Sequence, residues 1–186
     1  WTRDDGSESE AAAPYFRSSF TLTDPPHDAR IYIVGLGYFE LHINGRRVSN
    51  DQLAPAQSNY DQRTIGGKVI YPPPEPSATR VYYLAYDVSD YLRPGPNVVA
   101  VALGNGWYNQ RARVTEGEMW FGERRLLCQL ECDGQTLVSD TSWRVSTGGI
   151  RSDQVFGGET FDARQEPAEW TSPGYDDSAW RTAVFA

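Results

Sequence analysis

Paired carboxylates are the residues of this sequence whose types suit general acid–base chemistry. Such pairs include, in chain order, Asp4/Asp5, Glu116/Glu118 and Asp176/Asp177. An acid and a base must face one reacting group, whereas adjacent residues of a strand point to opposite faces. The first pair belongs to a polar N-terminal segment, and the last pair suits the capping of a turn. The middle pair alone therefore stays a candidate for catalysis.

The two cysteines, Cys128 and Cys132, invite a disulfide or a metal site, but their spacing favours neither. They share one face of segment 126–132 with two leucines, in the alternation of a half-buried strand. Four strand residues span about 13 Å, whereas the Cα atoms of a disulfide lie about 4.4–6.8 Å apart. Neither His27 nor His42 has a Cys or His at zinc-type spacing. We expect two free core thiols and no zinc.

A glycine-rich segment, residues 104–108, combines a Gly-x-Gly turn with two aromatic residues. Phosphate binding by such a turn uses the N-terminus of a following helix, and no helical pattern follows here. Asn105 and Gly106 therefore predict a tight turn that presents Trp107 and Tyr108. Whether these rings contact a ligand or pack the loop onto the edge of a sheet stays open, because an isolated Trp is more often part of a core.

Apolar and polar residues alternate with period two along most of the chain, which predicts β-strands. The expected strands are 16–22, 38–43, 46–48, 82–88, 98–103, 126–132, 136–139 and 143–146. Asn44-Gly45 supplies the two positive-φ residues of a type I′ hairpin. Helical signals are limited to single turns at 87–92 and 176–180. Short strands separated by Gly- and Pro-rich turns predict an all-β fold, an antiparallel jelly-roll β-sandwich.

The chain divides into a predicted tail, residues 1–13, and a single sandwich domain, residues 14–186. Two stretches, 65–80 and 111–123, interrupt the strand pattern and are expected to be long loops, which on a rigid sandwich often carry binding residues.

Charge and hydropathy exclude two classes of partner. Among the 186 residues, 17 are basic and 25 acidic, a net charge of −8 that leaves no basic face for a phosphate backbone. We therefore expect no nucleic-acid partner. The longest apolar stretch, residues 98–103, is much shorter than the about 20 residues of a membrane-spanning helix. No membrane partner is expected either.

Several blocks of the sequence, in a fixed order, carry a resemblance to a known family. These blocks are residues 38–48, 53–55, 59–61, 104–108, 143–148, 158–164 and 173–180. Together they resemble the N-terminal β-sandwich domain of bacterial α-L-rhamnosidases, over about residues 14–180. The resemblance implies a non-catalytic accessory domain of a larger, inverting glycoside hydrolase. The catalytic (α/α)₆ barrel and its carboxylates would follow Ala186 in the same polypeptide.

The resemblance also implies a ligand. In some members of the family, calcium bridges this domain to neighbouring hydroxyls of L-rhamnose, which suits a hard cation with six to eight oxygen ligands. Those members carry an Asp-Asn pair after the hairpin, where this sequence has Asn50-Asp51 in the reverse order. The implied metal ligands are Asn50, Asp51 and Glu116. The implied sugar contacts are Asn105, Trp107, Tyr108 and Trp120.

Alternatives remain for the motif and for the function. Asn50-Asp51 is also explained as an ordinary turn, since both residues favour turns. A second function is a structural domain that packs against the barrel and binds no sugar, which predicts an exposed apolar patch. Independent catalysis by Glu116 and Glu118 is a third. The expected partners are L-rhamnose or a rhamnosyl glycan and the catalytic barrel; the location, bacterial cytoplasm or secreted, stays open.

Overall fold

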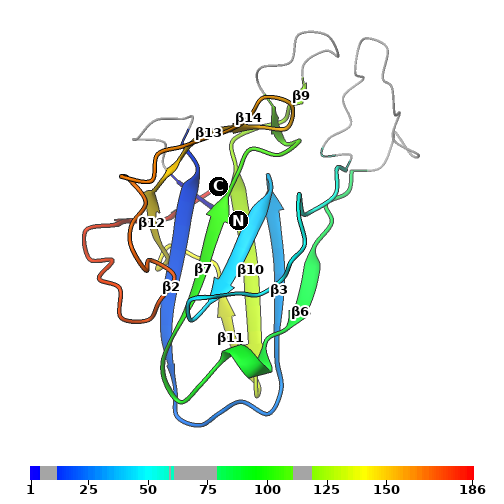
Figure 1. The fold of residues 1–186 in the computed structure, drawn as a ribbon. Helices are drawn as coiled ribbons and strands as arrows, with labels where there is room; N and C mark the ends of the chain where they lie inside the picture. The colour runs from blue at the N-terminus through cyan, green and yellow to red at the C-terminus, as the bar shows by residue number, and fades with distance from the viewer. Residues whose placement is uncertain (5–11, 59, 61–78, 111–118) are drawn as a thin grey trace.

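The chain folds as an all-β sandwich of two facing sheets (Figure 1). A computed structural model describes residues 1–4, 12–58, 60, 79–110 and 119–186. All strand pairs in these ranges are antiparallel. The predicted antiparallel β-sandwich is confirmed, and the finer assignment as a jelly roll stays a prediction. No helix in the described ranges is long and apolar enough to cross a membrane.

The two large sheets have six strands each. Sheet A has the order β16 (Val184–Phe185), β1 (Thr2–Arg3), β10 (Arg125–Cys132), β3 (Ala29–Leu36) and β6 (Leu84–Asp87), with β11 (Gln135–Val138) also paired to β10. Sheet B has the order β15 (Arg181–Thr182), β12 (Arg144–Thr147), β2 (Pro14–Leu22), β7 (Gly95–Leu103), β4 (Phe39–Ile43) and β5 (Arg46–Arg47). Two further hairpins are β8 (Asn109–Gln110) with β9 (Met119–Trp120), and β13 (Ile150–Gln154) with β14 (Gly158–Phe161).

The core between the sheets follows from the period-two alternation. On β10, Leu126, Cys128 and Leu130 are buried, and their strand neighbour Leu127 is exposed. Burying one such aliphatic side chain stabilises the fold by about 1.5–3 kcal/mol. Both cysteines are buried and free, as predicted. Trp143 also lies in this core, in agreement with its expected role.

The predicted hairpin between β4 and β5 is confirmed. Asn44 has φ 52° and Gly45 has φ 81°, the positive values that a type I′ turn requires. The Asn44 side chain adds long-range support, because its Nδ2 donates to the carbonyl of Tyr91 and to Oδ1 of Asn97. Its Oδ1 accepts the backbone N–H of Val98. The turn therefore joins β4 to the start of β7.

Several elements differ from the sequence-based expectation. Within the predicted N-terminal tail, β1 is a strand of sheet A between β10 and β16. Strand β3 was not predicted, although Ala29, Ile31 and Ile33 alternate with Arg30 and Tyr32 along it. Of the strand expected at 82–88, only β6 forms. The helical turn expected at 87–92 follows it as the 3₁₀ helix η1 (Ser89–Tyr91). The single turn expected at 176–180 is present, closed by a hydrogen bond from Trp180 to Asp177 and capped by Asp176 on the N–H of Ser178.

The outer face of sheet B is covered by the chain's own segment 162–180, orange to red beside β2 and β12 in Figure 1. Tyr15 and Ala100 of the sheet pack with Trp170 and Trp180 of this segment in a second apolar cluster. The Tyr15 and Trp170 rings stack with their centroids 4.4 Å apart. This face of β2 is buried at Tyr15 and Arg17, whereas Ser19 and Thr21 farther along the strand are exposed.

Arg17 fixes segment 162–180 to the sheet. Its side chain lies on the outer face of β2 and is only 1% exposed. Nε donates to Oδ2 of Asp177 at 2.8 Å, and Nη1 donates to the carbonyls of Trp170 and Ser172 at 3.0 and 3.2 Å. Nη2 donates to the carbonyl of Tyr175 at 3.1 Å. One buried guanidinium thus satisfies three carbonyls and one carboxylate of the covering segment.

Replacing Arg17 with Leu is expected to lower the free energy of unfolding by about 3 kcal/mol, because the four acceptors lose their donor in a buried site. Arg17→Lys keeps the charge but not the planar fork and should recover only part of this loss. Urea unfolding followed by tryptophan fluorescence measures both. The exposed Arg93 provides the control, since Arg93→Leu should change stability by no more than about 0.5 kcal/mol. Equal midpoints for Arg17→Leu and the wild type would contradict this role.

Candidate functional site

The predicted metal ligand Asp51 lies at a surface depression along one side of the sandwich. The depression has about 230 Å³ of space, open solvent included, and is lined by Phe39, Glu40, Leu41, Arg47, Ser49, Asp51, Ala54 and Tyr86. The segment after β5 forms one wall, because it folds back along β4 through backbone hydrogen bonds from Val48 to Leu41 and from Phe39 to Ala54. Tyr86 of β6 reaches the depression from the opposite sheet. The site therefore lies at the open edge between the sheets.

Asp51 is held as an exposed, ionised carboxylate. Its Oδ2 accepts a hydrogen bond from the Tyr86 hydroxyl at 2.9 Å, and its backbone N–H donates to Oγ of Ser49 at 3.0 Å. Hydrogen bonding by Ser49 and Tyr86 lowers the pKa of Asp51 below its usual value. In turn, burial and the bond to Asp51 raise the pKa of Tyr86 to about 12. Tyr86 thus stays a neutral donor that orients the carboxylate.

A second carboxylate, Glu40, lines the same depression and was not predicted. It forms an ion pair with Arg47 at 3.3 Å, and its Oε2 lies 3.7 Å from Nε2 of His42. The hydrogen bond to His42 and the charge of Arg47 outweigh burial and lower the pKa of Glu40. The sequence signal for Glu40 is its polar position in the alternation of β4, but only the fold brings Tyr86 and Asp51 beside it.

The other two predicted metal ligands are Asn50 and Glu116. Asn50 is exposed beside Asp51, and its carbonyl accepts Nε2 of Gln52 at 3.2 Å. Glu116 lies outside the described residues. In the ranges that are described, no three His, Cys, Asp or Glu side chains gather as a metal cluster. The carboxylate and amide oxygens fit a hard cation in type, as a partial shell that leaves most coordination positions to water or to a ligand.

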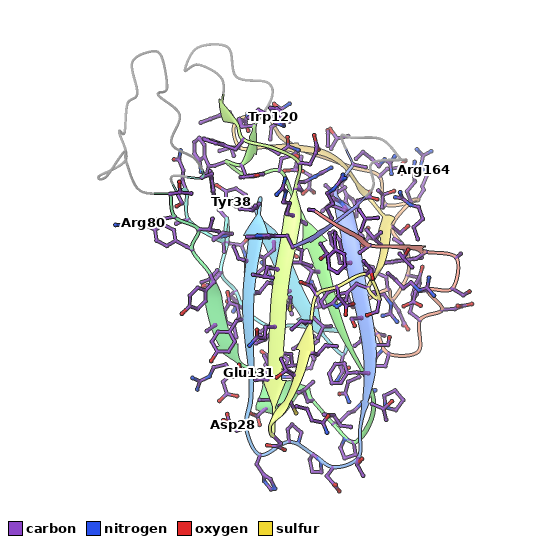
Figure 2. The ribbon with its side chains drawn as sticks, turned by 180° about the vertical axis from the view of Figure 1, so that it is seen from behind. Asp28, Tyr38, Arg80, Trp120, Glu131 and Arg164 are labelled. Atoms are coloured by element: carbon purple, nitrogen blue, oxygen red, sulfur yellow. The ribbon has the colours of Figure 1, made fainter. Side chains whose placement is uncertain are left out.

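The predicted aromatic contacts lie at one end of the sandwich, where β7 leads into β8 and where Figure 2 places Tyr38 and Trp120. Tyr108 is 7% exposed, with its ring edge-on to Tyr60 at 5.1 Å between centroids. Trp107 is half-buried and lies edge-on to Phe156 at 5.4 Å. We call Trp107, Tyr108 and the rings that they contact the aromatic cluster.

Asn105 positions the loop between β7 and β8. Its backbone N–H donates to Oδ1 of Asp153 at 2.7 Å, and its Nδ2 donates to the Asp153 carbonyl at 2.8 Å. Its Oδ1 accepts Nδ2 of Asn109 at 2.9 Å. Gly106 has φ 51°, and a Cβ there would lie 2.8 Å from the backbone nitrogen of Tyr38. The turn predicted at Asn105-Gly106 is confirmed, and the Asn105 side chain holds it to β13.

The depression and the aromatic cluster have different neighbours. Asn50 and Asp51 lie on the segment between β5 and β6, and Asp51 contacts Arg47 and Tyr86. The aromatic cluster contacts the β13–β14 hairpin through Phe156. The described contacts of Asp51 therefore do not include these aromatic side chains.

Comparisons with known proteins agree on one family. The model of the α-L-rhamnosidase N-terminal domain matches residues 24–65 and 63–186. An α-L-rhamnosidase of Streptomyces avermitilis is 41% identical over 180 residues, which are 91% of this chain and 15% of the relative. One of Formosa agariphila is 36% identical over 179 residues, which are 91% of this chain and 17% of the relative. The matched region is therefore a small part of each curated relative.

Solved structures give the same result. The structure of Streptomyces avermitilis α-L-rhamnosidase complexed with L-rhamnose is similar over 95% of this chain and 16% of that one, with 38% identity and a TM-score of 0.79. The α-L-rhamnosidase of Dictyoglumus thermophilum is similar over 94% of this chain and 18% of that one, with 33% identity and a TM-score of 0.77.

The buried carboxylate of Asp153 generates a prediction for pH dependence. Burial raises its pKa, and this effect outweighs the Asn105 N–H and the charge of Arg124. The folded state therefore holds this proton more tightly than the unfolded chain, so its contribution to stability is present in acid and is lost as pH rises through the raised pKa. Asp153→Asn keeps an acceptor for Asn105 but removes the charge.

We expect the free energy of unfolding of Asp153→Asn, relative to the wild type, to increase from about pH 4 to about pH 7. Urea midpoints at a series of pH values measure the trend. Asp24→Asn, at an exposed aspartate, is the control and should show no such rise. A difference that shrinks as pH rises would contradict the assignment.

Proposed function

Because this chain belongs to the family of α-L-rhamnosidase N-terminal domains, we propose that it is a non-catalytic accessory domain that binds L-rhamnose through calcium held at Asn50 and Asp51. The observation that carries the proposal is the exposed Asp51 carboxylate, oriented by Tyr86 at a depression beside a second carboxylate. The relative solved in complex with L-rhamnose supports the choice of sugar.

The proposed ligands would coordinate calcium through oxygen atoms. Asp51 supplies a carboxylate and Asn50 an amide oxygen, and Glu40 adds negative charge to the same depression. A bound calcium ion offers coordination positions that two neighbouring sugar hydroxyls can fill. The Tyr86 hydroxyl keeps the Asp51 carboxylate oriented and ionised, which makes the site ready for a cation at neutral pH.

The aromatic residues divide into two roles in this proposal. Trp107 and Trp120 keep partial exposure and are proposed to pack against the apolar face of a sugar. Tyr108 and Asn105 are proposed to position the loop that presents them, since the first is buried and the second is bonded to Asp153. Glu116 is proposed as a further oxygen ligand from the loop 111–123.

Replacing Asp51 with Ala is expected to abolish calcium-dependent binding of L-rhamnose while leaving the fold intact, because the carboxylate is exposed and outside the core. Calorimetric titration of L-rhamnose, with millimolar calcium and then with chelator, measures the effect. Tyr86→Phe should weaken binding several-fold, since Asp51 loses its orienting donor. Asp24→Ala, at an exposed aspartate distant in sequence, is the matched control and should bind normally.

The outcomes separate this proposal from the structural alternative. Heat that appears only with calcium and vanishes in Asp51→Ala supports the proposed site. Retained heat in that variant overturns the assignment of Asp51. No heat with or without calcium overturns sugar binding and favours a domain that only packs against the rest of a rhamnosidase.

A further inference from the structure

The outer face of sheet A carries a row of largely uncharged side chains across four strands. In register, Gln129 of β10 lies between Val138 of β11 and Tyr32 of β3, and Tyr32 lies opposite Ala85 of β6. The next row toward β9 places Leu127 opposite Val34. We call these two rows, with the neighbouring Tyr83, the apolar rows.

The apolar rows include side chains that are exposed despite their size. Leu127 and Val138 are 42% and 43% exposed, and Tyr83 is 66% exposed. The Tyr83 ring leans against Tyr32 with 6.1 Å between centroids. Three large apolar or aromatic side chains therefore lie on one sheet face in contact with solvent, which on a soluble domain marks an interaction site.

A charged row borders the apolar rows at the end of the sheet where Figure 2 labels Glu131. Glu131 lies between Thr136 and Arg30, and Arg30 lies opposite Asp87. Opposite charges thus neighbour one another, and Glu131 also accepts Nε2 of Gln129 at 2.7 Å. An uncharged centre with a polar rim is the usual composition of a protein interface.

The two outer faces of the sandwich differ in how far the chain itself covers them. On sheet B, the chain's own segment 162–180 covers Tyr15 and Arg17, and the Arg17 hydrogen bonds fix it there. On sheet A, Leu127, Val138 and Tyr83 retain the exposures given above. The described residues bury Val34 of the apolar rows but leave Leu127, Val138 and Tyr83 open to solvent.

We propose that the apolar rows are the docking surface for the part of a rhamnosidase polypeptide that follows this domain. The matched region is only 15–18% of each relative compared above, so most of each relative is available as the occupant. The last strand, β16, is the edge strand of this same sheet, so a polypeptide that continued from it would start at an edge of this sheet. The occupant presents apolar side chains at its centre and polar groups opposite Glu131 and Arg30. This inference is independent of sugar binding.

Hydroxyl-radical footprinting tests the surface on two proteins, this 186-residue chain and the full-length rhamnosidase polypeptide that carries it. We expect Tyr83 and Leu127 to be oxidised several-fold more slowly in the full-length polypeptide. Phe156 and Phe161, exposed on the β13–β14 hairpin, are internal controls and should be oxidised at similar rates in both. Equal rates at Tyr83 and Leu127, or protection of the controls alone, would overturn the proposal.

A charge placed in the apolar rows tests the same surface energetically. In the full-length polypeptide, Leu127→Glu should restore rapid oxidation of Tyr83, whereas Phe161→Glu, at an exposed apolar residue elsewhere, should not. The titration of L-rhamnose into this chain should be unchanged in Leu127→Glu, so the two proposals fail separately. Sedimentation identifies a different occupant: a dimer of this chain that dissociates on Leu127→Glu would assign the surface to a second copy and overturn the proposal.

Discussion

The buried guanidinium of Arg17 is the interaction on which the arrangement of this domain depends. Segment 162–180 has no strand of its own in sheet B, so its backbone carbonyls need donors from elsewhere where it covers the sheet. Arg17 supplies three of them and neutralises Asp177. With this face closed, the surfaces left for ligands and partners are the edges of the sandwich, its ends and the outer face of sheet A.

Polar side chains also join distant segments at the turns that frame the candidate site. Asn44 joins the β4–β5 hairpin to the start of β7, and Asn105 joins the loop after β7 to β13. Both replace missing backbone pairs with side-chain amides, which is why the turns are rigid although their strands are short. The depression at Asp51 relies on the first of these turns, since β5 and the segment after it form its wall.

Sequence alternation predicted the structural features that depend on neighbouring residues. It missed the features that depend on partners distant in sequence. The type I′ hairpin, the free cysteines and most strands of the core, β3 excepted, follow from spacing within a few residues. The role of Arg17 has no local sequence signal, because its acceptors lie about 155 positions away. Residues 1–13 were expected to be a tail because the partners of β1 are β10 and β16. Asp51 could be proposed from a motif, whereas Tyr86 and Glu40 beside it could not, because only the pairing of β6 with β3 and of β4 with β7 places them there.

Strand β6 connects the two proposed surfaces. Its residues alternate, so Tyr86 faces inward and reaches Asp51, while Ala85 faces outward in the apolar rows opposite Tyr32. The strand has four residues and lies at the edge of sheet A, held by β3 on one side. A partner docked on the apolar rows would pack against the outer side of the strand whose inner side orients the Asp51 carboxylate. In these two proposals, docking and cation binding act on the same short strand from its two sides.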